Sequence, residues 1–159
     1  MKTIKVMSVF GTRPEATKMA PLVRALEAAS PHISSKVVIS AQHRSMLDQV
    51  LRDFGIAADY DLDIMREGQT LSETTERVLR GFTPILESER PDLVLVHGDT
   101  ATTASAALCS YYQKIRCGHV EAGLRTGDKY APFPEEIMRH IADRISDMHF
   151  APTQLSKQN

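Results

Sequence analysis

The chain has 159 residues, of which 42% are hydrophobic and 25% charged, as in an ordinary globular protein. Its formal net charge of −1 gives no electrostatic basis for binding nucleic acid or an anionic membrane surface. Aromatic residues make up 6% and tryptophan is absent, which also argues against a base-stacking surface. The length fits one domain with a real core and is short for a two-domain enzyme.

The cysteines and the amino terminus point to a reducing compartment. Cys109 and Cys117 form no C-x-x-C pair and lie in apolar runs, so we expect buried free thiols. The apolar run from Val6 to Phe10 is interrupted by Ser8 and is too short for a signal peptide, and no segment approaches a membrane span. These features predict a cytoplasmic protein.

Strands and helices alternate along the first half of the chain. A β-branched run predicts a strand over residues 4–10, and apolar residues at helical spacing predict a helix over 14–29. A second buried strand is expected at 36–41 and a second amphipathic helix at 45–54. Residues 56–68 are the least regular and predict a short strand or an ordered loop.

The alternation continues in the second half, where a long helix begins at Thr70 and ends before Pro91. The elements expected after it are a strand at 92–97, a helix at 102–113, a strand at 115–120, a helix at 134–146, a strand at 148–151 and the first turns of a helix at 152–159. Near-continuous apolar strands separated by helices indicate an α/β fold, a Rossmann-like parallel sheet with helices on both faces. Its crossovers should be right-handed.

Polar residues follow the first two predicted strands. Gly11 permits a tight turn, and the free N–H groups of the next helix together with Arg13 could bind phosphate. An ordinary turn with Glu15 at the positive end of the helix explains the same pattern, and the turn matches no glycine-rich nucleotide motif. Gln42 and His43 could reach a ligand, although strand ends are polar in any α/β protein.

Acidic residues follow the later strands. Asp99 and Glu121 each close a predicted strand, and Glu135 opens a helix. Residues that leave the carboxyl ends of neighbouring parallel strands meet in one crevice, and carboxylates gathered there suggest acid/base chemistry. Structural roles remain open, because Asp99 or Thr100 could cap a helix and acids are favoured in a first helical turn.

Histidines accompany these acids. Side chains alternate along a strand, so we expect His119 and Glu121 on the same side of an extended segment. With His43, His97 and Asp99 they invite a metal hypothesis, but their spacing matches no known ligand motif. We therefore expect no metal.

Taken together, the longer motifs of the chain closely resemble the non-hydrolysing UDP-N-acetylglucosamine 2-epimerases, over essentially all 159 residues and in the right order; they are FGTRPEATKMAPL, AQHRSMLDQVL, DLVLVHGDT, GHVEAGLRTGD, YAPFPEE and HFAPT. The resemblance implies one half of a GT-B-like fold, in which two Rossmann-like domains enclose the active site. It also implies interconversion of UDP-GlcNAc and UDP-ManNAc for bacterial surface polysaccharides, no cofactor, and a homo-oligomer, commonly a homodimer.

The resemblance assigns roles to individual residues. It implies acid/base catalysis by Asp99, Glu121 and Glu135, through elimination of UDP to 2-acetamidoglucal and re-addition to the opposite face. Arg13 and Lys18 match basic residues near the diphosphate. Gln42 matches a residue of a regulatory UDP-GlcNAc pocket, and His43 and Glu136 complete the candidates for substrate binding.

The chain departs from the family pattern at Met138, in a minor way at Ala101 and Ala131, and in length. Met138 stands where family members usually carry an asparagine, which could alter sugar contacts. Residues 1–159 match only the amino-terminal domain, and the carboxy-terminal domain with a catalytic histidine is absent, so we expect the fragment alone to be inactive. The alternatives are a GT-B glycosyltransferase, a hydrolysing epimerase, and a UDP-sugar binding or dimerisation module without catalysis.

Overall fold

The computed structural model describes residues 2–41 and 44–159. One parallel sheet runs through this part of the chain in the strand order β3-β2-β1-β4-β5-β6. The strands are β1 (Ile4–Phe10), β2 (Ile33–Ile39), β3 (Tyr60–Asp61), β4 (Leu93–His97), β5 (Arg116–Val120) and β6 (Met148–Phe150). The helices are α1 (Arg13–Ala28), α2 (Arg44–Phe54), α3 (Leu71–Glu89), α4 (Ala101–Tyr112), α5 (Glu135–Ile145) and α6 (Gln154–Gln158).

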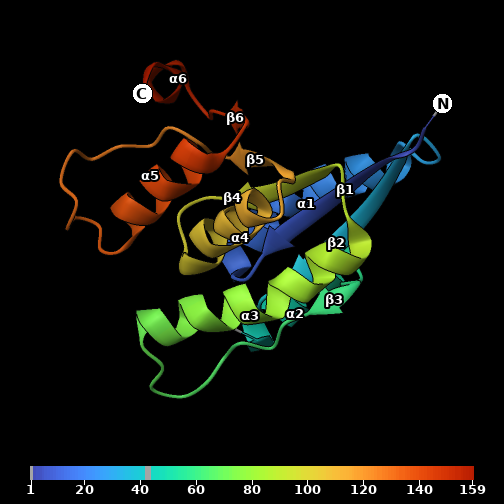
Figure 1. Ribbon diagram of the computed structural model, residues 1–159, viewed down its shortest axis with the longest axis horizontal. Helices are drawn as coiled ribbons and strands as arrows, with labels where there is room; N and C mark the ends of the chain where they lie inside the picture. The colour runs from blue at the N-terminus through green and yellow to red at the C-terminus, as the bar shows by residue number, and fades with distance from the viewer. Residues whose placement is uncertain (1, 42–43) are drawn as a thin grey trace.

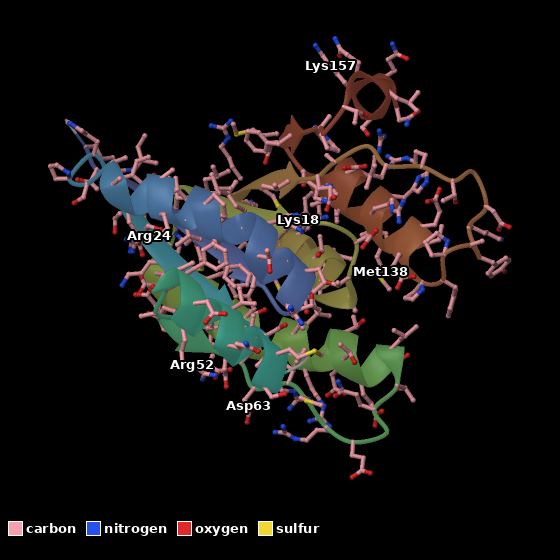
Figure 2. All side chains as sticks on the ribbon, turned by 180° about the vertical axis from the view of Figure 1, so that it is seen from behind. Lys18, Arg24, Arg52, Asp63, Met138 and Lys157 are labelled. Carbon is pink, nitrogen blue, oxygen red and sulfur yellow. The ribbon has the colours of Figure 1, made fainter. Side chains whose placement is uncertain are left out.

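The chain order reverses between β1 and β4, which are neighbours in the middle of the sheet. From β1 the chain builds outward to β2 and β3, and from β4 it builds the other way to β5 and β6. Helices α3, α4 and α5 lie on the near face in Figure 1, and α1 and α2 come to the front when the molecule is seen from behind in Figure 2. This arrangement confirms the Rossmann-like α/β fold and creates a switch point at the carboxyl ends of β1 and β4.

Two hydrophobic clusters hold the helices to the sheet. Phe10 and Met19 belong to the cluster under α1 and α2, while Phe82 and Cys109 belong to the cluster under α3 and α4. Both cysteines are buried and free, as expected, and burial raises the pKa of the Cys117 thiol to about 11. Among the residues that the structure describes, no helix has both the length and the apolar character required to cross a bilayer.

The second strand and the fifth helix differ from the predicted bounds. β2 starts at Ile33 rather than at 36, because Ser34 and Ser35 continue the pairing with β1 although they break the apolar pattern. Pro134 is the residue before α5 rather than its first residue. The long third helix starts after Thr70 as predicted, with a capping box between Thr70 and Glu73.

Replacing Phe82 by alanine should destabilise the fold by roughly 3–5 kcal/mol, because the ring is fully buried between α3 and the sheet and its loss leaves a cavity. Phe54, which is 41% exposed at the end of α2, is the matched control, and its replacement by alanine should cost clearly less. Urea unfolding at neutral pH measures both. Equal losses for the two variants would contradict the packing assigned to Phe82.

Candidate functional site

A crevice of about 160 Å³ lies at the switch point. Side chains from the segments that follow three strands line it: Thr12, Glu15 and Lys18 from the turn and helix after β1, Asp99 and Thr100 after β4, and Glu121 after β5. The sheet topology therefore brings Asp99 and Glu121 together, as their positions after predicted strands indicated, and Lys18, which the family resemblance assigned to the diphosphate, lies beside them. Glu135, which was expected in the same crevice, does not line it.

Glu15 ties two of these turns together. Its Oε2 accepts hydrogen bonds from the backbone N–H groups of Gly11 at 2.7 Å and Thr12 at 2.8 Å, and its Oε1 accepts one from the Thr100 hydroxyl at 2.6 Å. Burial raises the pKa of this carboxyl group, and these hydrogen bonds oppose that effect. Glu15 thus braces β1 against β4, a stronger structural role than the helix-dipole contact expected from the sequence.

Gly11 is required where the turn after β1 approaches Ser40, the residue that follows β2. A Cβ atom at this position would lie 1.9 Å from Oγ of Ser40, so any side chain would force the turn apart. The Ser40 hydroxyl in turn shares a 2.8 Å hydrogen bond with Thr102 at the start of α4. The tight turn predicted at Gly11 is therefore a consequence of packing between β1, β2 and α4.

Thr100, not Asp99, caps α4. The Thr100 Oγ1 accepts a hydrogen bond from the Thr103 N–H at 3.2 Å, in the usual N-cap geometry. The sequence left open whether Asp99 or Thr100 caps the helix. Because Thr100 is the cap, the Asp99 side chain lines the crevice instead.

The carboxylate of Asp99 lies in a crowded electrostatic environment. Burial raises its pKa, the attraction of Arg139 opposes this, and the negative charges of Glu135 and Glu121 raise it further. Arg139 Nη2 donates to Asp99 Oδ2 at 2.6 Å. Glu121 and Glu135 are therefore close enough to Asp99 to influence its pKa, and a raised pKa brings a carboxyl group closer to the range that suits proton transfer at neutral pH.

Glu121 is held by two basic side chains. Lys18 Nζ donates to its Oε1 at 2.5 Å, and His97 Nε2 lies 3.2 Å from its Oε2. Burial lowers the pKa of His97 to about 4, although the charge of Glu121 opposes this, so the ring is neutral near pH 7. Lys18 is therefore the cation of this group.

We predicted His119 and Glu121 on the same side of an extended segment, and this prediction is wrong at Glu121. β5 ends at Val120, and Glu121 has a left-handed backbone with φ of 66°. The His119 ring contacts Asp143 of α5, whereas the Glu121 carboxylate reaches Lys18 and His97. The alternation of side chains along a strand does not predict that a residue at its end will adopt a positive φ.

The remaining candidates for binding lie in different surroundings. Arg13 is exposed at the start of α1, and Glu135 is half-buried at the start of α5. Gln42 and His43 lie outside the described residues. Their proposed contacts with substrate stay predictions.

Glu136 orders the loop that precedes α5. Its carboxylate is 1% exposed and accepts hydrogen bonds from the backbone N–H groups of Thr126 at 3.1 Å and Gly127 at 3.2 Å. Arg139 Nη1 lies 3.4 Å from the same carboxylate. Arg139 thus connects Asp99 to the ordered loop, and a direct contact of Glu136 with substrate stays a prediction.

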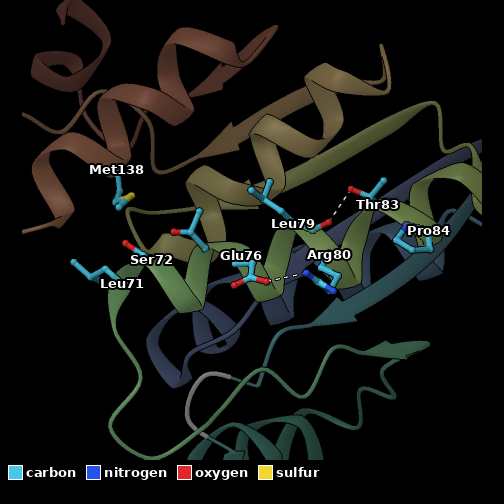
Figure 3. A pocket seen from close by; sticks show the side chains of 9 residues that line it. Leu71, Ser72, Glu76, Leu79, Arg80, Thr83, Pro84 and Met138 are labelled. Carbon is cyan, nitrogen blue, oxygen red and sulfur yellow. Dashed lines mark hydrogen bonds and ion pairs between the residues drawn. The ribbon is translucent and has the colours of Figure 1, made fainter.

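Met138 faces a different part of the molecule. It lines an open groove of about 790 Å³ with residues of α3, among them Leu71, Ser72 and Leu79 (Figure 3). Its neighbour Arg139 points instead to Asp99. The exchange of asparagine for methionine therefore alters the α3–α5 groove rather than the contacts of Asp99.

The part of the chain that the structure describes contains no group of three or more histidine, cysteine or acidic side chains arranged to share a metal ion. His97 and His119 make separate contacts, with Glu121 and with Asp143 respectively.

Sequence reasoning missed Arg139 and Asp143. Together with Glu136 they occupy positions i, i+3 and i+7 of α5, which lie on one helical face. This face is turned inward, while Ile137 and Ile141 are 40% and 38% exposed. The sequence signal for these residues is this charged stripe, which by itself predicts an exposed face because helices usually bury their apolar side.

Asp143 should make the protein sensitive to acid. Burial raises its pKa, but hydrogen bonds from His119 and Arg125 outweigh burial and hold the pKa at about 2, below the usual 3.8. A lowered carboxyl pKa stabilises the fold above pH 3.8, and this contribution, roughly 2 kcal/mol, is lost as the pH falls toward 2. Urea unfolding between pH 6 and pH 2 measures this loss, which Asp143→Asn should reduce. An unchanged pH dependence in the variant would contradict it.

Comparison with known proteins identifies similar sequences. A family model described as UDP-N-acetylglucosamine 2-epimerase matches residues 24–159. UDP-N-acetylglucosamine 2-epimerase of Salmonella typhimurium is 59% identical over 156 residues, which is 98% of this chain and 41% of the relative. The enzyme of the same name from Bacillus subtilis is 56% identical and is matched over 100% of this chain and 42% of its own length. The chain thus spans about two fifths of these curated relatives.

Solved structures agree with the sequence matches. UDP-GlcNAc 2-epimerase from Neisseria meningitidis, solved bound to UDP-GlcNAc, superposes with a TM-score of 0.94 at 55% identity, over 98% of this chain and 42% of that one. A lipopolysaccharide outer core galactosyltransferase superposes with a TM-score of 0.65 at 11% identity, over 98% of this chain and 41% of that one. The second likeness bears on the fold alone.

Proposed function

Because this chain belongs to the UDP-N-acetylglucosamine 2-epimerase family, we propose that residues 1–159 form the amino-terminal domain of an enzyme that interconverts UDP-GlcNAc and UDP-ManNAc. The observation that carries the proposal is that Asp99 and Glu121 line one crevice beside the cation of Lys18, with Glu135 close enough for its charge to raise the pKa of Asp99. The Neisseria relative that superposes on this chain was solved with UDP-GlcNAc bound, which supports a UDP-sugar as the ligand.

The chemistry requires more than one acid/base group. The C2 proton of the sugar is not acidic, so we propose that UDP leaves C1 as the C2 proton is removed, giving 2-acetamidoglucal. UDP then adds back while a proton is delivered to the opposite face of C2. This route needs carboxylates on both faces of the ring and positive charge for the departing diphosphate.

The residues of this chain suit these roles. Asp99, whose pKa is raised, and Glu121 and Glu135 beside it are the groups proposed to move protons. Lys18 lies in the crevice and Arg13 is exposed at the start of α1. Both cations are proposed to bind the diphosphate.

The proposal places the rest of the catalytic groups in a second domain. The relatives are more than twice as long as this chain, which matches their first two fifths. Catalysis depends on groups held together in one geometry, so residues 1–159 alone should be inactive. Assembly as a homo-oligomer is a further proposal, which sedimentation of the full-length protein tests.

The test follows UDP-GlcNAc by NMR with the full-length protein in D2O, and with residues 1–159 alone as the matched comparison. The proposal expects UDP-ManNAc carrying deuterium at C2 from the full-length protein and no turnover from the isolated chain. Release of free ManNAc and UDP would identify a hydrolysing epimerase instead. Transfer of the sugar to an acceptor would identify a glycosyltransferase, and binding without turnover would favour a UDP-sugar binding module.

A further inference from the structure

A fully buried histidine connects the turns that carry two of the proposed catalytic acids. The His119 ring is 0% exposed in β5 and faces one acceptor on each side. Its Nε2 donates to the carbonyl oxygen of Gly98 at 2.6 Å, and its Nδ1 donates to Asp143 Oδ1 at 2.5 Å. Because a carbonyl and a carboxylate only accept hydrogen bonds, each ring nitrogen faces an acceptor, and the ring joins the two groups.

The other oxygen of Asp143 extends this connection to the turn after β5. Asp143 Oδ2 accepts a hydrogen bond from the Gly123 N–H at 3.1 Å and lies 2.7 Å from Arg125 Nη2. One carboxylate on α5 therefore holds the turn after β4, through His119, and the turn after β5 directly.

Both turns contain a residue with positive φ, and the conformation of Glu121 needs support. Gly98 has φ of 70° directly before Asp99, and Glu121 has φ of 66° two residues before Gly123. A non-glycine residue in the left-handed region costs free energy and persists only where its surroundings hold it. The contacts made by His119 and Asp143 are at these turns, so they bear on where the carboxylates of Asp99 and Glu121 point.

From this geometry we propose that His119 and Asp143 are positioning residues that fix Asp99 and Glu121 relative to each other. The inference deepens the proposed epimerase function and rests on it where activity is measured. Neither residue lines the crevice, so they act through the backbone of the two turns and not on the substrate.

Asp147 provides a matched control, because its contact is at the opposite end of β5. Its Oδ2 accepts a hydrogen bond from the Cys117 N–H at 2.8 Å, near the start of β5. Asp143 lies in the last turn of α5 and Asp147 follows that helix, and each accepts a hydrogen bond from a backbone N–H in or just after β5. Asp147, however, lies away from the turns that carry the acids. Asp147→Asn should therefore affect stability without changing kcat by more than about twofold.

Two replacements of His119 separate its contacts. The amide nitrogen of asparagine falls near Nδ1 of the ring and keeps a donor for Asp143, whereas that of glutamine falls near Nε2 and keeps a donor for Gly98. In the full-length enzyme His119→Asn and Asp143→Asn should each lower kcat by about 10- to 100-fold with KM little changed, because small misplacements of catalytic groups are costly. His119→Gln should retain more of the activity than His119→Asn.

The same variants are examined by NMR, so that the result does not depend on activity alone. We expect changed backbone amide shifts at Asp99 and Glu121 in Asp143→Asn but not in Asp147→Asn. Unchanged shifts in folded Asp143→Asn, or a kcat equal to that of Asp147→Asn, would overturn the positioning role. If the wild-type enzyme does not epimerise UDP-GlcNAc, the proposed function fails, while the amide shifts still decide whether the two residues hold the turns.

Discussion

Replacing Asp99 by asparagine should lower kcat of the full-length enzyme for UDP-GlcNAc by roughly 10²- to 10⁴-fold. Asparagine fills the same space and can still contact Arg139, which donates to Asp99 Oδ2 at 2.6 Å. It cannot exchange a proton, however, and the pKa of Asp99 is raised by burial in a way that favours such exchange. Initial rates and the rate of deuterium uptake at C2 measure the loss, and both should fall together.

Asp92→Asn is the matched control for this experiment, because Asp92 directly precedes β4 whereas Asp99 follows that strand. Asp92 contacts Lys2 Nζ at 2.7 Å and accepts a hydrogen bond from the Lys5 N–H at 2.9 Å, away from the crevice. The control should lose some stability and keep its kcat. If Asp99→Asn kept kcat within about tenfold of the wild type, the proton-transfer role given to Asp99 would be wrong.

The positions of the proposed catalytic acids could be predicted because they depend on topology. Parallel strands place their carboxyl ends along one edge of the sheet, so Asp99 and Glu121 had to approach each other once β4 and β5 were recognised. The buried apolar runs that define these strands are strong local signals. The fold class and the crevice followed from the same signals.

The supporting contacts could not be predicted because they depend on tertiary packing. Glu15 looked like a favourable charge at a helix start, yet it is buried and joins two turns. α5 turns Arg139 and Asp143 inward and leaves Ile137 and Ile141 partly exposed, the reverse of the usual pattern. Such an inversion is stable only because the inward charges find partners, and those partners come from distant parts of the chain.

Replacing Glu121 by glutamine should also lower kcat by roughly 10²- to 10⁴-fold, and this loss should be coupled to Lys18. The two side chains are joined by a 2.5 Å hydrogen bond between Lys18 Nζ and Glu121 Oε1. Lys18→Met should lower kcat because it leaves the Glu121 carboxylate without its cation and weakens the site proposed for the diphosphate. Since each replacement disrupts the same pair, the double variant should lose less activity than the product of the single losses.

Lys36→Met is the matched control for the lysine, since Lys36 on β2 forms a comparable 2.7 Å ion pair with Asp59, and both side chains are about one-third exposed. It should change kcat by less than about twofold, because a partly exposed pair contributes little beyond local stability. Measured kcat and kcat/KM for the wild type, the two single variants and the double variant give the coupling. Losses that simply multiply would show that Lys18 and Glu121 act independently, and the lysine would then serve the diphosphate alone.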